Sequence, residues 1–274
     1  MKRIIVCLVI IATISTGTAN SQKASNDAQR VLEKLYGRFI NNYNDTIRLR
    51  VNDSIKVIIE RYVKSDSVFS YRFKNLRYLG QIISPDSSLK IITWNLVLTK
   101  SPSRYFCYFI KKQGQGKNRI YRLEAAYRED PIKLDTSYTE QDWYGALYYD
   151  IRPYKYNNEK CWILLGIDYG NPDISRKIID VLSFTSSDSI LFGKKWFESA
   201  YKVRFRDVFE YASNGMMSLR FKSDSSIVFD HLVPFSPFRK NDRQYYGPDY
   251  SNDAYNFSKG LWRLIINVDA RNKE

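Results

Sequence analysis

Histidine and cysteine are scarce in this chain of 274 residues, which holds one histidine and three cysteines. A zinc site normally takes several His or Cys ligands, and no cysteine here stands in a Cys-x-x-Cys pair. His231 follows Asp230 directly, and neighbouring residues on a strand face opposite sides, which disfavours a catalytic relay between these two. The shortages argue against zinc and Ser-His-Asp chemistry. We expect His231 to be a hydrogen-bonded structural residue.

One apolar run stands near the start of the chain, and it is too short to cross a membrane. Met1–Arg3 is basic, Ile4–Ile14 is apolar apart from one threonine, and small polar residues follow up to Ser21. A membrane-spanning helix needs roughly 18–20 apolar residues, whereas a secretory signal has this basic, apolar and small-residue order. Residues 1–21 are therefore predicted to be a signal peptide. We expect export to the periplasm or cell surface of a Gram-negative bacterium, without a stable membrane anchor after cleavage.

Acidic residues are in the minority, since 43 lysines and arginines face 29 aspartates and glutamates. The formal net charge of +14 falls to +12 when Lys2 and Arg3 leave with the signal peptide. Such a charge suits nucleic acid, anionic lipid or acidic glycans, but the basic residues are scattered among acids. The nearest approach to a patch is Lys111–Arg119, at the tip of an expected hairpin. We expect no nucleic-acid partner and interpret the charge as an aid to solubility.

Two cysteines, Cys107 and Cys161, remain after removal of the signal peptide, each inside an apolar and aromatic run. An exported compartment permits a disulfide between them. Free cysteine is also among the most buried residue types. The interpretation we favour is two separate buried thiols, with the disulfide as the open alternative.

Residues 22–75 have the pattern of helices. Asn26 is placed to cap a first helix, with Gln29 as the partner in a capping box. A second helix is expected over Asp45–Lys64, where apolar residues recur on one face at Ile47, Val51, Ile55, Ile58, Ile59 and Tyr62. Both helices are amphipathic and need a surface to pack against. We expect them to cover an edge or face of a sheet, with membrane or partner binding as the alternative.

Residues 76–274 change to short strands rich in β-branched and aromatic residues. Leu89–Val97, Arg104–Lys111 and Arg119–Ala125 are joined by short turns, which predicts an antiparallel meander. The most continuous apolar runs are Cys161–Ile167 and Ile178–Phe184, which have the pattern of buried strands joined by a polar turn. In all, the pattern predicts roughly a dozen short strands at a spacing of about 8–12 residues. The fold class predicted is mostly β, an antiparallel meander in a sandwich, barrel or incomplete propeller, preceded by two helices.

Several segments together resemble a known family. They are Trp143–Tyr149, Leu164–Asp168, Arg176–Phe184, Val228–Leu232 and Tyr245–Asp249. With them the chain resembles a family of uncharacterised exported proteins from Bacteroidetes-type bacteria. The resemblance covers most of the chain after the signal peptide and is stronger from Trp143 onward. It implies export, and it carries over no activity and no catalytic residue.

The chain is rich in aromatic residues, with 22 tyrosines, 15 phenylalanines and five tryptophans, and this content is the feature that most suggests a binding surface. Exposed rings on loops form amphipathic platforms for a sugar, peptide or protein, although many will be core or cross-strand pairs. The segment Tyr245–Tyr255 is the best candidate for exposure, because Gly247 and Pro248 disfavour a regular strand. The candidate ligand-binding residues are Tyr245, Tyr246, Tyr250 and Tyr255.

Three aspartates in strand regions, Asp168, Asp180 and Asp230, are candidates for catalysis. Two carboxylates at one sheet end can act as acid and base in glycoside hydrolysis when they are about 5–10 Å apart. Turn capping or a salt bridge to Arg176 or Lys177 is the simpler interpretation, because an unpaired buried carboxylate is costly.

The segment Asp249–Asp253 places oxygen ligands at alternate positions, as calcium loops do. It is not an EF-hand, because Ala254 and Gly260 replace the required glycine and glutamate. The candidate metal ligands are Asp249, Ser251 and Asp253, in a calcium site that shares Asp168, Asn171 or Asp173. The alternative is a turn cluster whose side chains bind their own backbone.

Two functions from different classes follow. The first is a non-catalytic binding protein that takes a glycan, peptide or protein on its aromatic loops. The alternative is a secreted, glycosidase-like hydrolase that uses paired aspartates. The oligomeric state stays open.

Overall fold

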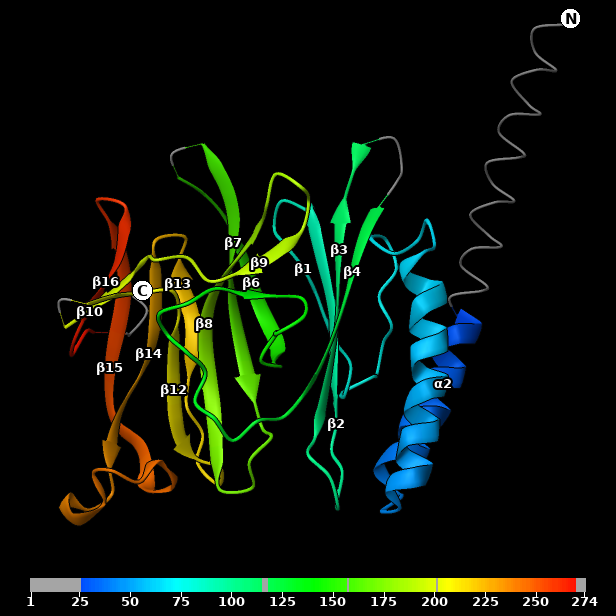
Figure 1. Ribbon diagram of the computed structural model, residues 1–274, viewed down its shortest axis with the longest axis horizontal. Coiled ribbons are helices and arrows are strands. Elements are labelled where there is room, and N and C mark those ends of the chain that lie inside the picture. Colours follow the sequence, from blue (N-terminus) through cyan, green and yellow to red (C-terminus); the bar gives the residue numbers. More distant parts are fainter. Residues whose placement is uncertain (1–25, 115–117, 157, 201, 270–274) are drawn as a thin grey trace, which may run out of the picture.

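Four layers make up the molecule in the computed structural model: a pair of helices and three stacked sheets (Figure 1). The structure describes residues 26–114, 118–156, 158–200 and 202–269, so the expected signal peptide over 1–21 lies outside it. The fold is mostly β with the helices first, as predicted, and of the arrangements expected the stacked sheets of a sandwich fit it. Within the described ranges, no helix is long and apolar enough to span a membrane.

The helix pair consists of a first helix over residues 26–40 and α2 (Asp45–Val63). The Asn44 side chain caps α2 by accepting a hydrogen bond from the N–H of Ile47. The apolar faces of both helices pack on the outer face of the first sheet, which confirms that they cover a sheet. That core includes Leu32, Tyr36, Phe39, Val51, Ile55 and Ile59 from the helices, and Ile92, Trp94, Phe106 and Tyr108 from the sheet.

The first sheet is the predicted antiparallel meander, in the order β1-β2-β3-β4. Its strands are β1 (Gly80–Ile83), β2 (Leu89–Leu96), β3 (Arg104–Lys112) and β4 (Asn118–Ala126). Buried hydrogen bonds fix the helices to it: Nε1 of Trp94 on β2 donates to Oδ1 of Asn52 on α2 at 2.8 Å, and Nζ of Lys90 on β2 donates to the Tyr62 hydroxyl on α2 at 2.6 Å.

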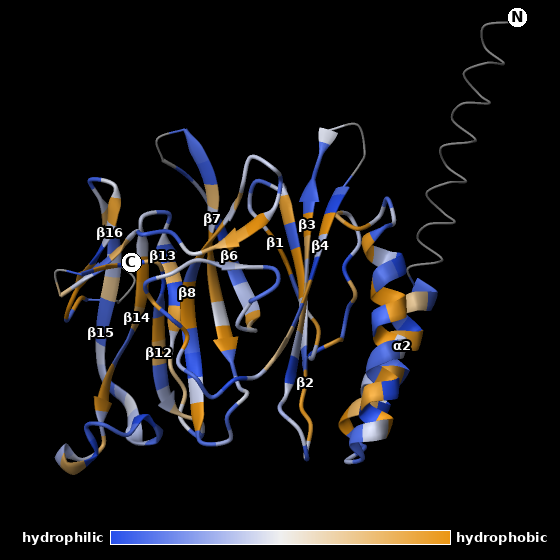
Figure 2. Cartoon of the chain, in the orientation of Figure 1, coloured by the Kyte–Doolittle hydropathy of each residue, from blue (hydrophilic) through white to orange (hydrophobic). Residues whose placement is uncertain are grey.

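The middle sheet has the order β5-β9-β8-β7-β6. Its strands are β5 (Tyr138–Thr139), β6 (Leu147–Tyr156), β7 (Glu159–Asp168), β8 (Ile174–Phe184) and β9 (Ile190–Phe192). A further strand, β12 (Asp207–Ala212), pairs with the first part of β8. Figure 2 shows hydrophobic residues along these strands and hydrophilic ones in most of the loops that join them.

Both faces of the middle sheet are buried, and β7 shows why its sequence is a continuous apolar run. Trp162 and Leu164 point into the core shared with the first sheet, whereas Ile163 and Leu165 point into the core shared with the third sheet. Side chains alternate along a strand, so a strand covered on both sides needs apolar residues at every position.

The two cysteines lie in different cores. Cys107 packs between the first and middle sheets, whereas Cys161 packs between the middle and third sheets. Both are free and buried, which confirms two separate thiols. The middle sheet itself stands between them.

The third sheet has the order β11-β10-β16-β15-β14-β13, and its β10–β16 pair is parallel, an exception to the antiparallel pattern expected. Its strands are β10 (Phe197–Ser199), β11 (Lys202–Arg204), β13 (Leu219–Ser223), β14 (Ser226–Pro234), β15 (Tyr246–Ser258) and β16 (Leu261–Ile265). Two short 3-10 turns, η2 (Pro237–Arg239) and η3 (Arg243–Tyr245), connect β14 to β15.

The tyrosine-rich segment from Tyr246 onward is a strand, which corrects the expectation of an irregular loop. Pro248 pairs with Leu232, and beyond it three residues of β15 face the single residue His231 of β14. This bulge explains how β15 accommodates a proline, since bulges already interrupt the hydrogen-bond ladder.

Candidate functional site

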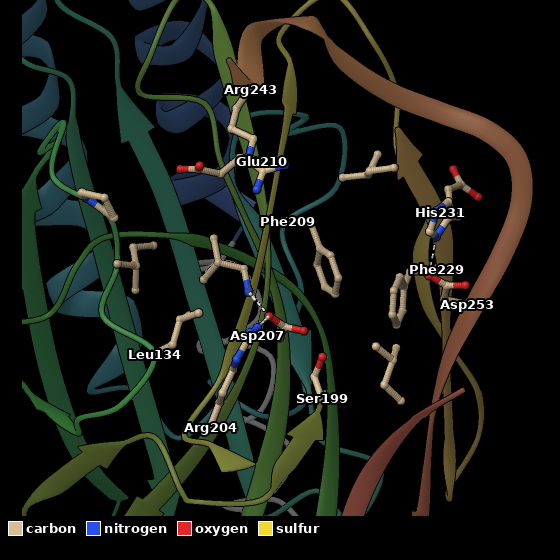
Figure 3. A pocket seen from close by; sticks show the side chains of 16 residues that line it. Leu134, Ser199, Arg204, Asp207, Phe209, Glu210, Phe229, His231, Arg243 and Asp253 are labelled. Atoms are coloured by element: carbon tan, nitrogen blue, oxygen red, sulfur yellow. Dashed lines mark hydrogen bonds and ion pairs between the residues drawn. The ribbon is translucent and has the colours of Figure 1, made fainter. Parts of the chain in front are cut away.

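A cavity of about 450 Å³ lies between β12 and the third sheet (Figure 3). Its volume is in the range of small-ligand sites, which span about 300–1,000 Å³. Polar and charged side chains reach it from the end of β11, from β12, β14 and β15, and from η3.

The bulge between β14 and β15 shapes one wall of this cavity. Four successive residues of β14, Phe229–Leu232, all line it, whereas a regular strand would present only every second side chain. Bulges turn side chains in this way and are common beside binding sites. Within the bulge Tyr250 has a φ of 70°, the left-handed region that a non-glycine residue rarely adopts.

Two phenylalanines occupy the middle of the cavity. The ring centroids of Phe209 on β12 and Phe229 on β14 are 4.5 Å apart, with their planes inclined by 41°. Figure 3 shows them between two groups of polar side chains, one around Asp207 and one around His231. A ligand there meets an apolar surface flanked by hydrogen-bonding groups.

Asp207 is the centre of the first polar group. Its Oδ2 accepts a hydrogen bond from the Tyr255 hydroxyl at 2.6 Å, and its Oδ1 forms an ion pair with Arg204 at 3.2 Å. Burial raises the pKa of Asp207, and the Tyr255 hydrogen bond and Arg204 partly offset that rise. The carboxyl is fixed in position and takes up a proton more readily than an exposed aspartate.

His231 and Asp253 form the second polar group. Nδ1 of His231 lies 2.7 Å from Oδ2 of Asp253, whose Oδ1 accepts a hydrogen bond from the N–H of Asn267. The expectation of a hydrogen-bonded histidine is confirmed. An aspartate that holds one ring nitrogen fixes the ring orientation, which leaves Nε2 as the nitrogen for a ligand.

Three more charged residues line the cavity. Glu210 pairs with Arg176 at 2.9 Å, and Asp230 accepts a hydrogen bond from the N–H of Ser218 at 2.7 Å. Arg243 is exposed, with its guanidinium 4.3 Å from the Tyr246 ring centroid. Carboxylates and the arginines Arg204 and Arg243 therefore surround the apolar centre formed by the two phenylalanines.

The structure does not bring the three candidate catalytic aspartates together. Asp180 is fully buried inside the middle sheet, where Arg206 and the Tyr144 hydroxyl bind its Oδ2 at 2.9 and 2.8 Å. Asp168 is bound by the Tyr105 hydroxyl and the N–H of Gly170, with Arg176 at 3.4 Å. Only Asp230 lines the cavity.

Burial raises the pKa of both Asp168 and Asp180, while their hydrogen bonds and arginine partners oppose the rise. The simpler interpretation of these two aspartates, salt bridging, is the one found, and for Asp168 the partner is the expected Arg176.

The four candidate tyrosines do not form one exposed platform. Tyr255 is buried and donates to Asp207, while Tyr246 is buried and donates to the carbonyl of Lys240 at 2.6 Å. Tyr245 is half-buried beneath Arg239. Only Tyr250, 98% exposed, stands free on the surface. The reason is that β15 continues through this segment: Tyr246 and Tyr255 lie in its paired parts, whereas Tyr250 lies in the bulge between them.

The candidate calcium ligands point in different directions. Oδ1 of Asp249 accepts hydrogen bonds from the N–H and the hydroxyl of Ser251, the turn arrangement weighed as the alternative. Asp253 instead points toward His231. Among the residues that the structure describes, no group of three or more His, Cys, Asp or Glu side chains gathers in the manner of a metal site.

The loop with Asn171 and Asp173 lies at the same end of the stacked sheets as the turns between β14 and β15 (Figure 1). Oδ1 of Asn171 binds the N–H groups of Asp173 and Ile174 in its own turn. In the described parts of the chain, no hydrogen bond or ion pair joins the two loops, so a shared site gains no support.

Sequence reasoning missed Asp207, Arg204, Phe209, Glu210 and Arg243. They lie in β11, β12 and η3, which carry no motif, and the pairing of β12 with β8 brings Asp207, Phe209 and Glu210 opposite β14. In comparisons with known proteins, no protein-family model, no curated protein and no solved structure matches the chain.

Proposed function

We propose that this protein is a non-catalytic binding protein that takes a carbohydrate in the cavity between β12 and β14. The observation that carries the proposal is the Phe209–Phe229 pair, flanked by Asp207 on one side and by His231 on the other. A sugar offers an apolar C–H face to aromatic rings and hydroxyls to carboxylates, arginine and histidine. Pockets with apolar walls and a few placed polar groups are the usual form of small-ligand sites.

Of the ligands expected from the sequence, a glycan, a peptide or a protein, the proposal takes the glycan, and it moves the site. The exposed tyrosine loop is replaced by the cavity, where Tyr255 holds Asp207 and Tyr246 supports Arg243 from behind. Export to the periplasm or cell surface belongs to the same proposal. A peptide is the alternative ligand for the cavity, and binding to a glycan array against a peptide library separates the two.

The test uses residues 22–274 on a glycan array, followed by calorimetry with the best glycan. Charge-assisted hydrogen bonds contribute about 1.5–3 kcal/mol, so His231→Ala and Arg243→Ala should each weaken binding by about tenfold or more. Arg239→Ala is the matched control, because Arg239 lies in the same connection but does not line the cavity. Melting temperatures of the variants should stay close to that of the parent.

Two results would contradict the site. One is full affinity in His231→Ala and Arg243→Ala. The other is loss of binding in Tyr250→Ala alone, which would return the site to the exposed loop.

A second candidate function is glycosidase-like hydrolysis in the same cavity. The observation that favours it is the combination of a carboxyl with a raised pKa, Asp207, and an oriented His231–Asp253 pair. Asp230 lines the cavity as well and would supply a further carboxylate. Incubation with the glycan that binds best should then release products, and Asp207→Asn should stop the release. Binding without any turnover would leave the first function standing.

A further inference from the structure

A second cavity, of about 580 Å³, lies where the helix pair meets the first and middle sheets. It is lined by the end of the first helix, α2, β1, β2, β6, the end of β7 and the residue that follows it. It shares no lining residue with the cavity around Asp207. Nothing in the proposed carbohydrate site depends on it.

The walls of this second cavity are apolar. Phe39, Leu147 and Ile167 line it, with Phe39 and Ile167 buried and Leu147 half-buried. Its rim holds Tyr78 and Tyr169, which are 52% and 53% exposed, together with the exposed Ile40 and Val97. Contiguous exposed apolar side chains of this kind mark binding grooves in soluble proteins.

The charged side chains that line this cavity are all positive. Among the described residues that line it, Arg48 and Arg77 are charged and none is an aspartate or glutamate. Arg48 donates from Nη1 to the carbonyl of Val97 at 2.7 Å and from Nε to the carbonyl of Asn42, and both acceptors are neutral. Asp45 lies close enough to interact with Arg48, but its carboxylate is held by the N–H groups of the loop at Thr99.

Arg77 is the cation available to a ligand. It is exposed at the rim, and in the described ranges of the chain no acid pairs with it. The neighbouring Asn95 is half-buried in the same cavity and adds an amide. A guanidinium binds a carboxylate with two parallel hydrogen bonds, which makes arginine the preferred partner of that group.

We propose that this cavity binds a single-chain anionic amphiphile, a carboxylate on an unbranched alkyl chain. The alkyl chain lies against Phe39, Leu147 and Ile167, and the carboxylate meets Arg77 at the rim. The volume of the cavity suits such a ligand, because small-molecule sites have about 300–1,000 Å³. The absence of any lining acid distinguishes it from the carbohydrate site, whose walls carry four carboxylates.

The experiment is calorimetric titration of the protein with dodecanoate and with dodecanol, both kept below the concentrations at which they aggregate. The two probes share the alkyl chain and differ in charge. We expect dodecanoate to bind with about tenfold higher affinity, the effect of about 1.4 kcal/mol from one charge-assisted contact. Equal affinities would overturn the role of Arg77, and no binding of either probe would overturn the whole proposal.

Variants test the position of the ligand. Arg77→Ala should lower the affinity for dodecanoate about tenfold and leave that for dodecanol unchanged, whereas Arg77→Lys should restore part of it. Arg50→Ala is the matched control, an exposed arginine on α2 outside the cavity. Val97→Trp should fill the groove and remove binding of both probes, with an unchanged melting temperature as proof of folding. Full affinity in Val97→Trp would place the amphiphile elsewhere.

Discussion

Replacing Arg206 by methionine tests how the middle of this fold is held together. Arg206 is fully buried, and its Nε donates to Oδ2 of Asp180 at 2.9 Å. Its Nη1 donates to the carbonyls of Lys133 and Thr136, and its Nη2 to the carbonyl of Phe192 at 3.2 Å. One guanidinium thus ties a strand of the middle sheet to the connection before it.

Methionine keeps much of the volume and removes the charge and every donor. Asp180 is then left as an unpaired, fully buried carboxylate, and loss of one partner of a buried ion pair costs about 3–5 kcal/mol. We expect Arg206→Met to lower the free energy of unfolding by about 4 kcal/mol. For about 250 residues this corresponds to a fall in melting temperature of about 8–16 °C, at about 2–4 °C per kcal/mol.

The double variant Asp180→Leu, Arg206→Met is the control. It removes both charges, and an apolar replacement of a whole buried pair is often close to neutral, so roughly half or more of the lost stability should return. Urea unfolding followed by tryptophan fluorescence measures all three proteins. A loss below about 1 kcal/mol in the single variant, or a double variant no more stable than the single, would refute the reasoning.

The pH dependence of Arg206→Met has a definite sign. Burial raises the pKa of Asp180, and removal of the arginine that opposes the rise moves this pKa further up. A carboxyl whose folded pKa lies above its unfolded value contributes stability when protonated and loses it as the pH rises through the folded value. The deficit of the variant should therefore be smaller at pH 5 than at pH 8.

Three further predictions concern other sites. Nζ of Lys90 is enclosed by the Tyr62 hydroxyl and the carbonyls of Val68 and Tyr71, and burial lowers the pKa of Lys90 to about 8 from an ordinary 10.5. The unfolded chain therefore binds more protons between these values, so the parent should gain stability from pH 8 toward 10.5 relative to Lys90→Met; parallel curves would contradict this. Burial raises the pKa of the Cys161 thiol to about 12 and also raises that of Cys107. Iodoacetamide at pH 8 should therefore label both only in denaturant, as mass spectrometry of peptides would show, and labelling of the folded protein would contradict the buried thiols. Finally, Tyr250→Asn relieves a left-handed tyrosine and should raise the stability by up to about 1 kcal/mol, whereas a loss in urea unfolding would mean that the exposed ring has a packing role.

The sequence predicted the fold class well where local pattern carries the information. The first meander follows from short turns between β-rich segments, and the apolar run Cys161–Ile167 indicated a strand with both faces buried. The order of strands in the third sheet was not predictable, because the parallel contact of β10 with β16 joins segments about 65 residues apart. No local pattern encodes such a pairing.

Three residues that line the cavity had been singled out from the sequence in other roles. His231 was expected to be structural, Asp230 was a candidate for catalysis, and Asp253 was a candidate calcium ligand. The bulge in β15 was not predicted. It separates Asp249 from Asp253, so the oxygen ligands at alternate positions that suggested a calcium site do not converge. Asp207 was not recognised, because its partner Tyr255 lies 48 residues away on another sheet.

The burial of Arg206 could not be predicted from the sequence either. In the sequence it is one basic residue among 43 lysines and arginines, with an acid beside it and no apolar run around it. Its burial depends on Asp180 and on three carbonyls supplied by other segments. A charge enters a core only where distant residues satisfy it, and sequence pattern alone does not reveal those partners.

The doubly covered middle sheet also sets the order in which the chain can complete its fold. The helices and the first sheet, residues 26–126, leave the ribosome first and can cover one face of β7 as soon as it appears. The opposite face, with Cys161, Ile163 and Leu165, waits for β14 to β16, which begin about 60 and end about 100 residues later. Until those strands arrive, an apolar surface of the partly folded chain faces water, which favours aggregation. Completion of this core therefore depends on Trp262 and its neighbours at the far end of the chain.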